Sequence, residues 1–293
     1  MNSEGFESIK QEYEGNKTVY DRLRKEIEFI LKERLESQRI PYHLVEGRVK
    51  GWESIAKKLR ERDNWSTLGD LSDVCGLRVV CLFSSDVDRI CKLIESTFRI
   101  TKTDDKRSTK PEDSFGYLSV HYDAVLPESY KGERYDSLKG MKFEIQVRTI
   151  ATHAWCSISH HLDYKHPSTV PSSLRRDFNA LSALFHLADS TFERFYEASI
   201  EEKRAVEGKP LEEIEKEEIN FHTVYAYVTF KYPERGPTPP EHVHVVTLKL
   251  QRYGCRIVSE LDGYMRRTEK AFEELEKDFK KAGYTDIHGG GVI

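Results

Sequence analysis

Strict alternation of apolar and polar residues over positions 143–148 (Phe-Glu-Ile-Gln-Val-Arg) constrains the fold of this chain more than any other feature. Successive side chains of a β-strand point to opposite faces, so this pattern predicts a strand with one apolar face. The other face would carry Glu144, Gln146 and Arg148. The sequence therefore predicts a sheet that is covered on one side and presents polar chemistry on the other.

A second stretch, positions 117–121, alternates in the same way and would place Tyr117, Ser119 and His121 on one face. A sheet face that is merely solvated alternates too, but it prefers Thr, Lys and Glu. The mixed acidic, basic and aromatic set on these two strands therefore predicts a shared functional site.

Three further patterns complete the predicted core. Positions 77–83 are apolar except for Arg78, which is typical of a central strand covered on both faces. A short strand is predicted at 42–45, and the polar stretch 101–114 is predicted to be a loop. Helical spacing predicts helices at the following positions: 6–37, 52–62, 86–98, 150–164, from 171 onward, 241–253 and 264–282.

Helices that alternate with strands in the middle of the chain favour an α+β or α/β core with helical flanks. We expect a helical segment over 1–40, a central domain over 41–200 and a mostly helical C-terminal region over 201–293. This last region is a candidate for regulation or interaction. A stripe of Leu and Phe on the helix after position 171 would suit packing within the fold or an interface in a homo-oligomer.

Two carboxylates are the candidate metal ligands. Asp73 stands just before the central apolar run, and Glu144 lies on the polar face of a neighbouring strand. Together they would form an oxygen-rich Mg²⁺ site, because Mg²⁺ prefers one or two carboxylates plus substrate phosphates. The alternative for Asp73 is a helix or turn cap.

Basic residues near the first predicted strand are candidates for phosphate binding. Arg48 and Lys50 lie two apart at a strand end, and Ser54 and Lys58 lie four apart on one helix face. A serine near a helix N-terminus with Arg and Lys beside it suits a triphosphate. A solvated helix surface would show the same residues.

The predicted helix 150–164 would have two distinct faces. Its spacing puts Trp155, Ile158 and Leu162 on a buried face, and its polar face would line the same cleft as the strands. The adjacent histidines at 160–161 lack a matching Cys or third His nearby, so we expect no metal there.

Composition narrows the function classes. A formal net charge of −4 provides no field that draws the whole chain to nucleic acid or membrane, so phosphate binding must rely on local Lys and Arg clusters. The five cysteines form no C-x-x-C pair, which suits reduced core thiols in the cytosol. No stretch reaches the roughly 18 apolar residues of a membrane span, and the N-terminus resembles no signal peptide. We expect a cytoplasmic protein.

Five motifs over about positions 48–165, in order and with similar spacing, resemble the synthetase domain of the RelA/SpoT family, the alarmone (p)ppGpp synthetases. The motifs are Gly47-Arg48-Val49-Lys50 with Ser54-Ile55 and Lys58-Leu59; Asp73-Val74-Cys75-Gly76-Leu77-Arg78; Gly116-Tyr117-Leu118-Ser119-Val120-His121; Glu144-Ile145-Gln146-Val147-Arg148-Thr149; and Trp155 with His160 and Tyr164-Lys165.

The resemblance implies a nucleotidyltransferase-like α+β fold, a mixed sheet flanked by helices. It also implies transfer of the β,γ-pyrophosphate of ATP to the ribose 3′-hydroxyl of GDP or GTP. Asp73 and Glu144 would bind Mg²⁺, and Glu144 would also help to deprotonate the attacking hydroxyl. Tyr117 would stack on the acceptor base. The remaining nucleotide-binding residues would be Arg48, Lys50, Ser54, Lys58, Arg78, His121, Gln146 and Arg148.

Two departures from the family pattern shape the expectation. The chain has no His-Asp dipeptide of the kind that marks the family's hydrolase domain, so it should make its product and not degrade it. Typical synthetases read Pro-Lys-x-Asn-Gly-Tyr before the stacking tyrosine. Here Asp113 stands in place of the Lys and Phe115 in place of the Asn, with Lys106, Arg107 or Lys110 as substitutes for the missing charge.

The altered loop leaves the acceptor open. Some small relatives are toxins that pyrophosphorylate the 3′ end of tRNA, and an adenine nucleotide is a related alternative. A third reading, from a different class, is a non-catalytic regulatory protein on the same fold. Mg²⁺-dependent consumption of ATP separates that reading from both enzymes.

Overall fold

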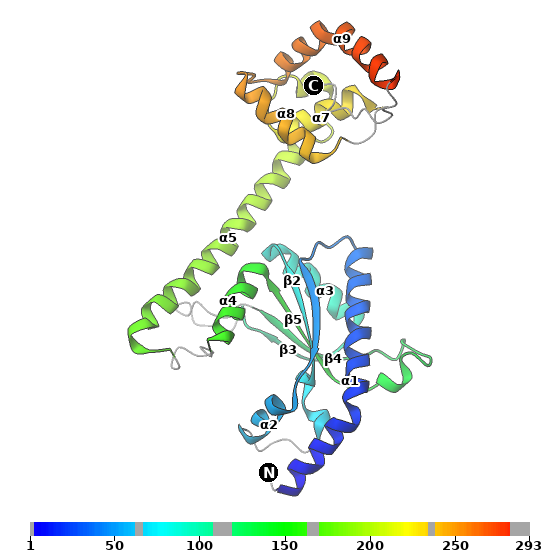
Figure 1. The fold of residues 1–293 in the computed structure, drawn as a ribbon, viewed down its shortest axis with the longest axis vertical. Coiled ribbons are helices and arrows are strands. Elements are labelled where there is room, and N and C mark those ends of the chain that lie inside the picture. Colours follow the sequence, from blue (N-terminus) through cyan, green and yellow to red (C-terminus); the bar gives the residue numbers. More distant parts are fainter. Residues whose placement is uncertain (1–2, 62–66, 108–118, 163–169, 234–237, 282–293) are drawn as a thin grey trace. The chain divides into compact units, whose positions relative to one another are not determined.

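The computed structural model describes residues 3–61, 67–107, 119–162, 170–233 and 238–281 (Figure 1). The chain divides into two compact units, Met1–Arg194 and Phe195–Ile293. The first unit contains the sheet, and the second consists of helices.

The first unit is built on a five-stranded mixed sheet of order β1-β2-β5-β4-β3. Strands β2 and β5 pair in parallel, and the other neighbours are antiparallel. This confirms the predicted α+β class. The strands are β1 (Leu44–Val49), β2 (Cys75–Cys81), β3 (Arg99–Asp105), β4 (Val120–Val125) and β5 (Phe143–Thr149).

Five helices accompany the sheet: α1 (Ser3–Ser37), α2 (Trp52–Glu61), α3 (Ser84–Thr97), α4 (Ile150–His161) and α5 (Arg175–Val206), the last of which continues into the second unit. Short 3₁₀ turns occur at η1 (Leu68–Asp70), η2 (Ser72–Val74), η3 (Asp136–Leu138) and η5 (Ser172–Leu174). The apolar face of the sheet packs against α1 and α3 in a single hydrophobic core. Helix α4 contacts β2 and β5, outside that core.

The alternation in β5 has the predicted consequence. Phe143, Ile145 and Val147 are fully buried in the core, together with Leu23 and Ile27 of α1. Burial of such side chains stabilises each by about 1.5–3 kcal/mol relative to exposure. This face therefore holds the sheet against its helices and leaves the opposite face for the polar side chains.

Helix α1 approaches β1 so closely that one strand position must be glycine. A Cβ built on Gly47 would lie 2.7 Å from Cγ of Arg24, which is closer than such contacts occur. Arg24 is held in place by ion pairs to Asp21 and Glu28 on its own helix. The side-chain stem of Arg24 therefore lies across the backbone of β1.

The prediction of a loop from Thr101 was wrong as far as Asp105, because Arg99–Asp105 forms β3. This strand lies at the edge of the sheet and pairs only with β4 among the described residues. Most of its side chains are exposed or half-buried, so the sequence lacks the apolar signal of an interior strand.

The predicted buried face of α4 was also wrong in part. Trp155 is buried, but Ile158 and Leu162 are each 51% exposed. The helix instead packs through smaller residues, which are Ala151, Thr152, Cys156 and Ser159. Small side chains at steps of three and four permit close approach to the sheet, and a search for large apolar residues overlooks them.

The second unit has a separate hydrophobic core. Its helices after α5 are α6 (Leu211–Ile214), α7 (Phe221–Lys231), α8 (Pro240–Arg252) and α9 (Val258–Lys281), and the last two confirm the helices predicted at 241–253 and 264–282. Buried Asp262 on α9 accepts a hydrogen bond of 2.6 Å from the Tyr227 hydroxyl and pairs with Lys231, so it joins α7 to α9. Within the described residues, no helix combines the length and apolar character needed to cross a membrane.

Candidate active site

The register of the sheet aligns polar side chains from separate strands in two rows. One row consists of Glu46, Arg78, Gln146 and His121 on β1, β2, β5 and β4. The next row consists of Arg48, Gly76 and Glu144 on β1, β2 and β5. Residues that face each other across paired strands lie close enough to interact, so the polar face of the sheet concentrates charge at its centre.

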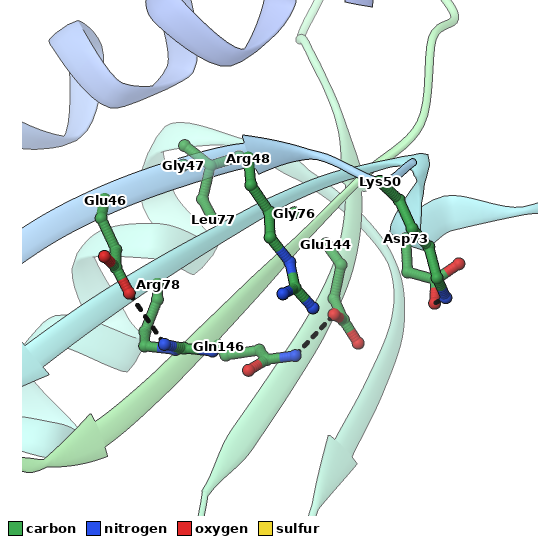
Figure 2. A pocket seen from close by; sticks show the side chains of 10 residues that line it. All are labelled: Glu46, Gly47, Arg48, Lys50, Asp73, Gly76, Leu77, Arg78, Glu144 and Gln146. Carbon is green, nitrogen blue, oxygen red and sulfur yellow. Dashed lines mark hydrogen bonds and ion pairs between the residues drawn. The ribbon is translucent and has the colours of Figure 1, made fainter. Parts of the chain in front are cut away.

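A cavity of about 290 Å³ lies over these rows (Figure 2). Six of the predicted site residues line it, together with four residues that were not singled out. The predicted six are Arg48, Lys50, Asp73, Arg78, Glu144 and Gln146, and the other four are Glu46, Gly47, Gly76 and Leu77.

Asp73 lies at one end of the cavity between two lysines. Its Oδ2 atom is 2.7 Å from Nζ of Lys50 and 3.0 Å from Nζ of Lys58. Burial alone would raise the pKa of Asp73, but its contacts with Lys50 and Lys58 outweigh burial and hold the pKa below its ordinary value. The carboxyl is therefore ionised at neutral pH. Its Oδ1 atom is buried and has no hydrogen-bond partner among the described residues.

Glu144 is held from two sides. Its Oε1 atom is 3.0 Å from Nδ1 of His121, and its Oε2 atom accepts a hydrogen bond of 2.7 Å from Nε2 of Gln146. Burial would raise the pKa of Glu144, but these partners lower it below its ordinary value. Buried Ser119 approaches the other ring nitrogen of His121 at 2.8 Å, which fixes the orientation of the imidazole. Glu144 is thus an oriented carboxylate anion.

The opposite end of the cavity contains an ion pair across β1 and β2. The guanidinium of Arg78 donates a hydrogen bond of 2.7 Å to Oε1 of Glu46. Arg148 is only 1% exposed, does not line the cavity, and donates a hydrogen bond to Oε1 of Gln146. Burial, and then the charges of Arg78 and Arg148, lower the pKa of His153 on α4 below its ordinary value.

Arg48 differs from the other cations of the cavity. Its side chain makes no hydrogen bond or ion pair with any residue that the structure describes. Figure 2 shows its guanidinium pointing into the space beside Glu144 and Gln146. An exposed guanidinium that lines a cavity is suited to bind an incoming anion in a bidentate manner.

One predicted residue lies away from the cavity, and another is not described. Ser54 is exposed on α2, one turn before Lys58, and is absent from the cavity wall. Tyr117 falls outside the described residues, as do Lys110, Asp113 and Phe115 of the altered loop.

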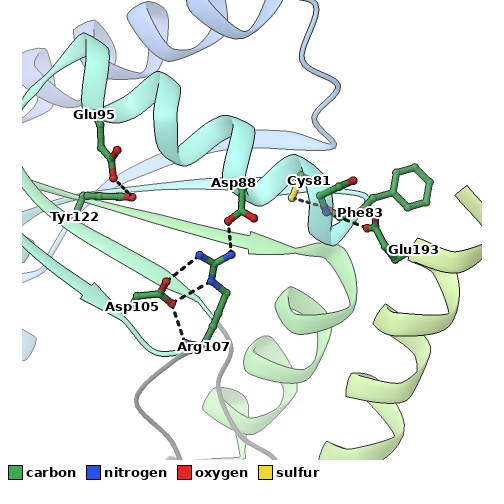
Figure 3. Close-up of polar contacts among 9 residues, drawn as sticks. Cys81, Phe83, Asp88, Glu95, Asp105, Arg107, Tyr122 and Glu193 are labelled. Carbon is green, nitrogen blue, oxygen red and sulfur yellow. Dashed lines mark hydrogen bonds and ion pairs between the residues drawn. The ribbon is translucent and has the colours of Figure 1, made fainter. Parts of the chain in front are cut away.

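Arg107, one proposed substitute for the missing loop lysine, forms ion pairs at the β3 edge of the sheet. Arg107 binds Asp105 on β3 and, at 2.8 Å, Asp88 on α3 (Figure 3). Its pKa is raised, first by the hydrogen bonds to Asp105. The carboxylates of Asp88 and Asp105 therefore neutralise the charge of Arg107 at this position.

Sequence reasoning missed Glu46 and the structural role of Ser119. Glu46 is two residues before Arg48 and therefore shares a strand face with it. This shared face could have been predicted from the spacing in the sequence. Its pairing with Arg78 depends on the register between β1 and β2, which no local pattern encodes.

The donor set suits Mg²⁺ only with help from a substrate. Among the described residues, no group of three or more His, Cys, Asp or Glu side chains is arranged to hold a metal ion. The cavity does offer two ionised carboxylates, and Oδ1 of Asp73 is a buried oxygen without a partner. Mg²⁺ typically takes one or two carboxylates and completes its shell with phosphate oxygens and water. The residues present therefore fit Mg²⁺ that arrives with a phosphorylated ligand.

Comparison with known proteins gives a consistent assignment. A family model described as a region found in RelA and SpoT proteins matches residues 47–169, which include every strand of the sheet except the first residues of β1. The chain is 30% identical over 156 residues to the GTP pyrophosphokinase YwaC of Bacillus subtilis (strain 168). The matched region covers 51% of this chain and 71% of YwaC. It is also 26% identical over 174 residues to the GTP pyrophosphokinase YjbM of the same strain, and this match covers 59% of this chain and 74% of YjbM.

The fold agrees with these matches. The structure of a GTP pyrophosphokinase family protein from Streptococcus pneumoniae superimposes with a TM-score of 0.55 at 26% identity and covers 65% of this chain and 95% of that protein. The matched segment contains Arg48, Asp73 and Glu144 of the cavity. The chain therefore belongs to the RelA/SpoT family.

Proposed function

We propose that this chain transfers the β,γ-pyrophosphate of ATP to the ribose 3′-hydroxyl of GDP or GTP. Pyrophosphokinase activity in general follows from the family, since both matched relatives are named GTP pyrophosphokinases. In the proposed reaction the 3′-oxygen of the acceptor bonds to the β-phosphorus of ATP. The bond from that phosphorus to the oxygen bridging it to the α-phosphorus breaks, and AMP leaves.

One observation carries the proposal. A single cavity contains two ionised carboxylates, Asp73 and Glu144, beside the cations Arg48 and Lys50. A third carboxylate, Glu46, also lines the cavity and pairs with Arg78. Phosphoryl-type transfer needs little covalent chemistry from a protein, because positioning and charge neutralisation dominate its catalysis. Cations bind the phosphates, and carboxylates bind the accompanying Mg²⁺. A cavity that serves only for binding has no need for two carboxylates where phosphates are expected.

The lysine end of the cavity suits the triphosphate. Lys50 and Lys58 both contact one oxygen of Asp73 and lie where they would also reach phosphate oxygens. Mg²⁺ would be held by Asp73 and Glu144 together with the phosphates, and it would neutralise charge that develops during transfer. Arg48, without a partner among the described residues, would bind the same phosphates.

Glu144 would act on the acceptor. Its carboxylate stays ionised because His121 and Gln146 lower its pKa, so it is ready to accept a hydrogen bond from the 3′-hydroxyl. A carboxylate with a lowered pKa is a weak base. Its main contribution would be to orient the hydroxyl and to receive the proton as the new bond to phosphorus forms.

The test is transfer of label from γ-labelled ATP in the presence of Mg²⁺. GDP, GTP, AMP, ADP, ATP and deacylated tRNA are offered separately, with Glu144→Gln as the control. We expect label on guanine nucleotides, reduced at least about 100-fold in the variant. Label only on tRNA or on adenine nucleotides would replace the proposed acceptor, and the substitutions at Asp113 and Phe115 favour these two as the second candidates. Label on none would support the non-catalytic reading.

We also propose a cytoplasmic location. All five cysteines are free and buried. Reduced thiols of this kind suit a reducing compartment.

A further inference from the structure

Gly76 lies near the start of β2, on the polar face of the sheet. It lies on β2 between Arg48 of β1 and Glu144 of β5, in register with both, and it lines the cavity. Its neighbours along the same face are Asp73, just before the strand, and Arg78. A side chain at this position would therefore stand between the main cation and the main anion of the site (Figure 2).

Nothing within the protein requires a glycine here. The glycines with positive φ are Gly132, Gly140, Gly208 and Gly254 among the described residues, so the backbone at position 76 is open to any L-residue. A Cβ built on Gly76 meets no atom within 4 Å. Gly47, by contrast, is required by its contact with Arg24.

Glycine is also a poor choice for an interior strand on energetic grounds. It loses more conformational freedom on folding than alanine, and it provides no side chain for packing. A glycine in the middle of a strand therefore marks a bulge, a bend or a close approach by a ligand. Gly76 pairs with Arg48 of β1 and with Glu144 of β5, and neither pairing has a register shift that would indicate a bulge, which favours the approach of a ligand.

We propose that Gly76 forms the floor on which the polyphosphate of the donor nucleotide lies, in van der Waals contact with its Cα atom. This inference rests on the proposed function. A polyphosphate at this position would reach the guanidinium of Arg48 on one side. Its metal ion would reach the carboxylate of Glu144 on the other. Gly76 thus determines how deeply the donor enters the cavity.

The test compares three variants by two measurements, the unfolding temperature and the Kd for α,β-methylene-ATP with Mg²⁺. Gly76→Ala adds one methyl group to the floor, and Gly76→Val adds a larger side chain that strands tolerate well. Gly15→Ala is the matched control, because Gly15 is exposed on α1 and its added Cβ also meets nothing within 4 Å. Titration calorimetry on the full chain gives the Kd.

We expect stability and binding to change in opposite directions at position 76. Gly76→Ala should unfold at the wild-type temperature or above, because alanine restricts the unfolded chain. Its Kd should rise about tenfold, and that of Gly76→Val should rise further, because an added methyl group displaces a tightly packed ligand. Gly15→Ala should also gain stability and should bind as the wild type does.

Two results would overturn the inference. One is an unchanged Kd in both Gly76 variants, and the other is a lower unfolding temperature in Gly76→Ala, which would make the glycine structural. If the wild-type chain binds the analogue but transfers no label, the proposed function fails while the floor remains testable by binding. If the wild-type chain does not bind the analogue, both the donor site and the proposed role of Gly76 are rejected.

Discussion

At the scale of single residues, the cavity places the carboxylates of Asp73 and Glu144 next to partners that determine their ionisation state. Lys50 and Lys58 keep Asp73 ionised, and His121 and Gln146 do the same for Glu144. Each contact has a consequence for stability or for pH dependence that can be measured separately. Three residue substitutions distinguish these consequences.

Replacement of Asp73 by asparagine should destabilise the folded chain by about 1–2 kcal/mol at pH 7, because two lysines lose their shared counterion. The folded pKa of Asp73 lies below its unfolded value of about 4, so its contribution is present above that pH and is lost as the pH falls through the folded pKa. Urea unfolding at a series of pH values checks this. The wild type and the variant should converge in acid, and a constant difference would contradict the ion pair.

Replacement of His121 by alanine should shift the acid limb of the pH–rate profile to higher pH. The buried Glu144 loses its strongest stabilising partner, so its pKa rises and protonation inactivates it at a less acidic pH. The profile of kcat against pH measures the shift. Ser119→Ala leaves the contact between His121 and Glu144 in place and should shift the limb less. An unshifted limb in His121→Ala would show that Glu144 does not control it.

Replacement of Glu46 by glutamine should tighten the binding of inorganic pyrophosphate several-fold. The change removes a negative charge from the cavity wall and keeps a hydrogen-bond acceptor for Arg78. The effect should shrink as salt is added, because the side chain of Glu46 is 51% exposed and its charge is screened. Weaker binding would instead mean that Glu46 itself contacts the ligand or that Arg78 needs its charge.

At the scale of secondary-structure elements, helix α5 is fastened to the sheet by a buried acid. Asp189 on α5 accepts a hydrogen bond of 2.5 Å from Thr149, the residue that ends β5 and caps α4. Its other oxygen is buried without a partner among the described residues. Burial raises the pKa of Asp189, so the folded chain favours the protonated form.

Asp189→Asn should therefore stabilise the chain by about 1 kcal/mol at pH 7. Because the folded pKa lies above the unfolded one, the contribution of Asp189 to stability is fully present below the unfolded pKa and is lost as the pH rises through the folded pKa. Asparagine imitates the protonated acid and removes this dependence. Chemical denaturation of both chains at low and neutral pH measures it, and a less stable variant at pH 7 would show that the carboxylate is needed as an anion.

Prediction of these elements from the sequence succeeded where burial creates a pattern. The alternation in β5 and the apolar run in β2 come from interior strands, whose faces differ in environment. Strand β3 escaped prediction because an exposed edge strand carries no such pattern. The small residues by which α4 packs were not predicted either, because they lack a strong apolar pattern.

The residue types of the site were predictable from the sequence. The pairing of Glu46 with Arg78 was not, because it requires the strand order and register, which depend on long-range contacts.

At the scale of the whole molecule, the described residues form two hydrophobic cores that share no residue. One belongs to the sheet unit and the other to the helices of the second unit. Separate cores predict separate unfolding transitions, because each unit buries its apolar surface independently.

The distribution of tryptophan makes this testable. All three tryptophans, Trp52, Trp65 and Trp155, belong to the first unit, so their fluorescence reports on that unit alone. Val224→Ala removes two buried methyl groups from the second core and should destabilise it by about 1–3 kcal/mol. We expect an earlier transition by circular dichroism and an unchanged one by fluorescence. Parallel shifts in both signals would mean that the two units unfold as one.

The most direct test of the proposed chemistry is the identity of the by-product. Purified protein is incubated with Mg²⁺, ATP and GDP, and AMP, ADP and the new nucleotide are quantified together by ion-exchange chromatography. Transfer of pyrophosphate predicts one AMP for each acceptor modified, no stoichiometric ADP, and loss of both products in Glu144→Gln. Formation of ADP in proportion to product would show that a single phosphate is transferred. Unchanged turnover in Glu144→Gln would show that the reaction does not take place in this cavity.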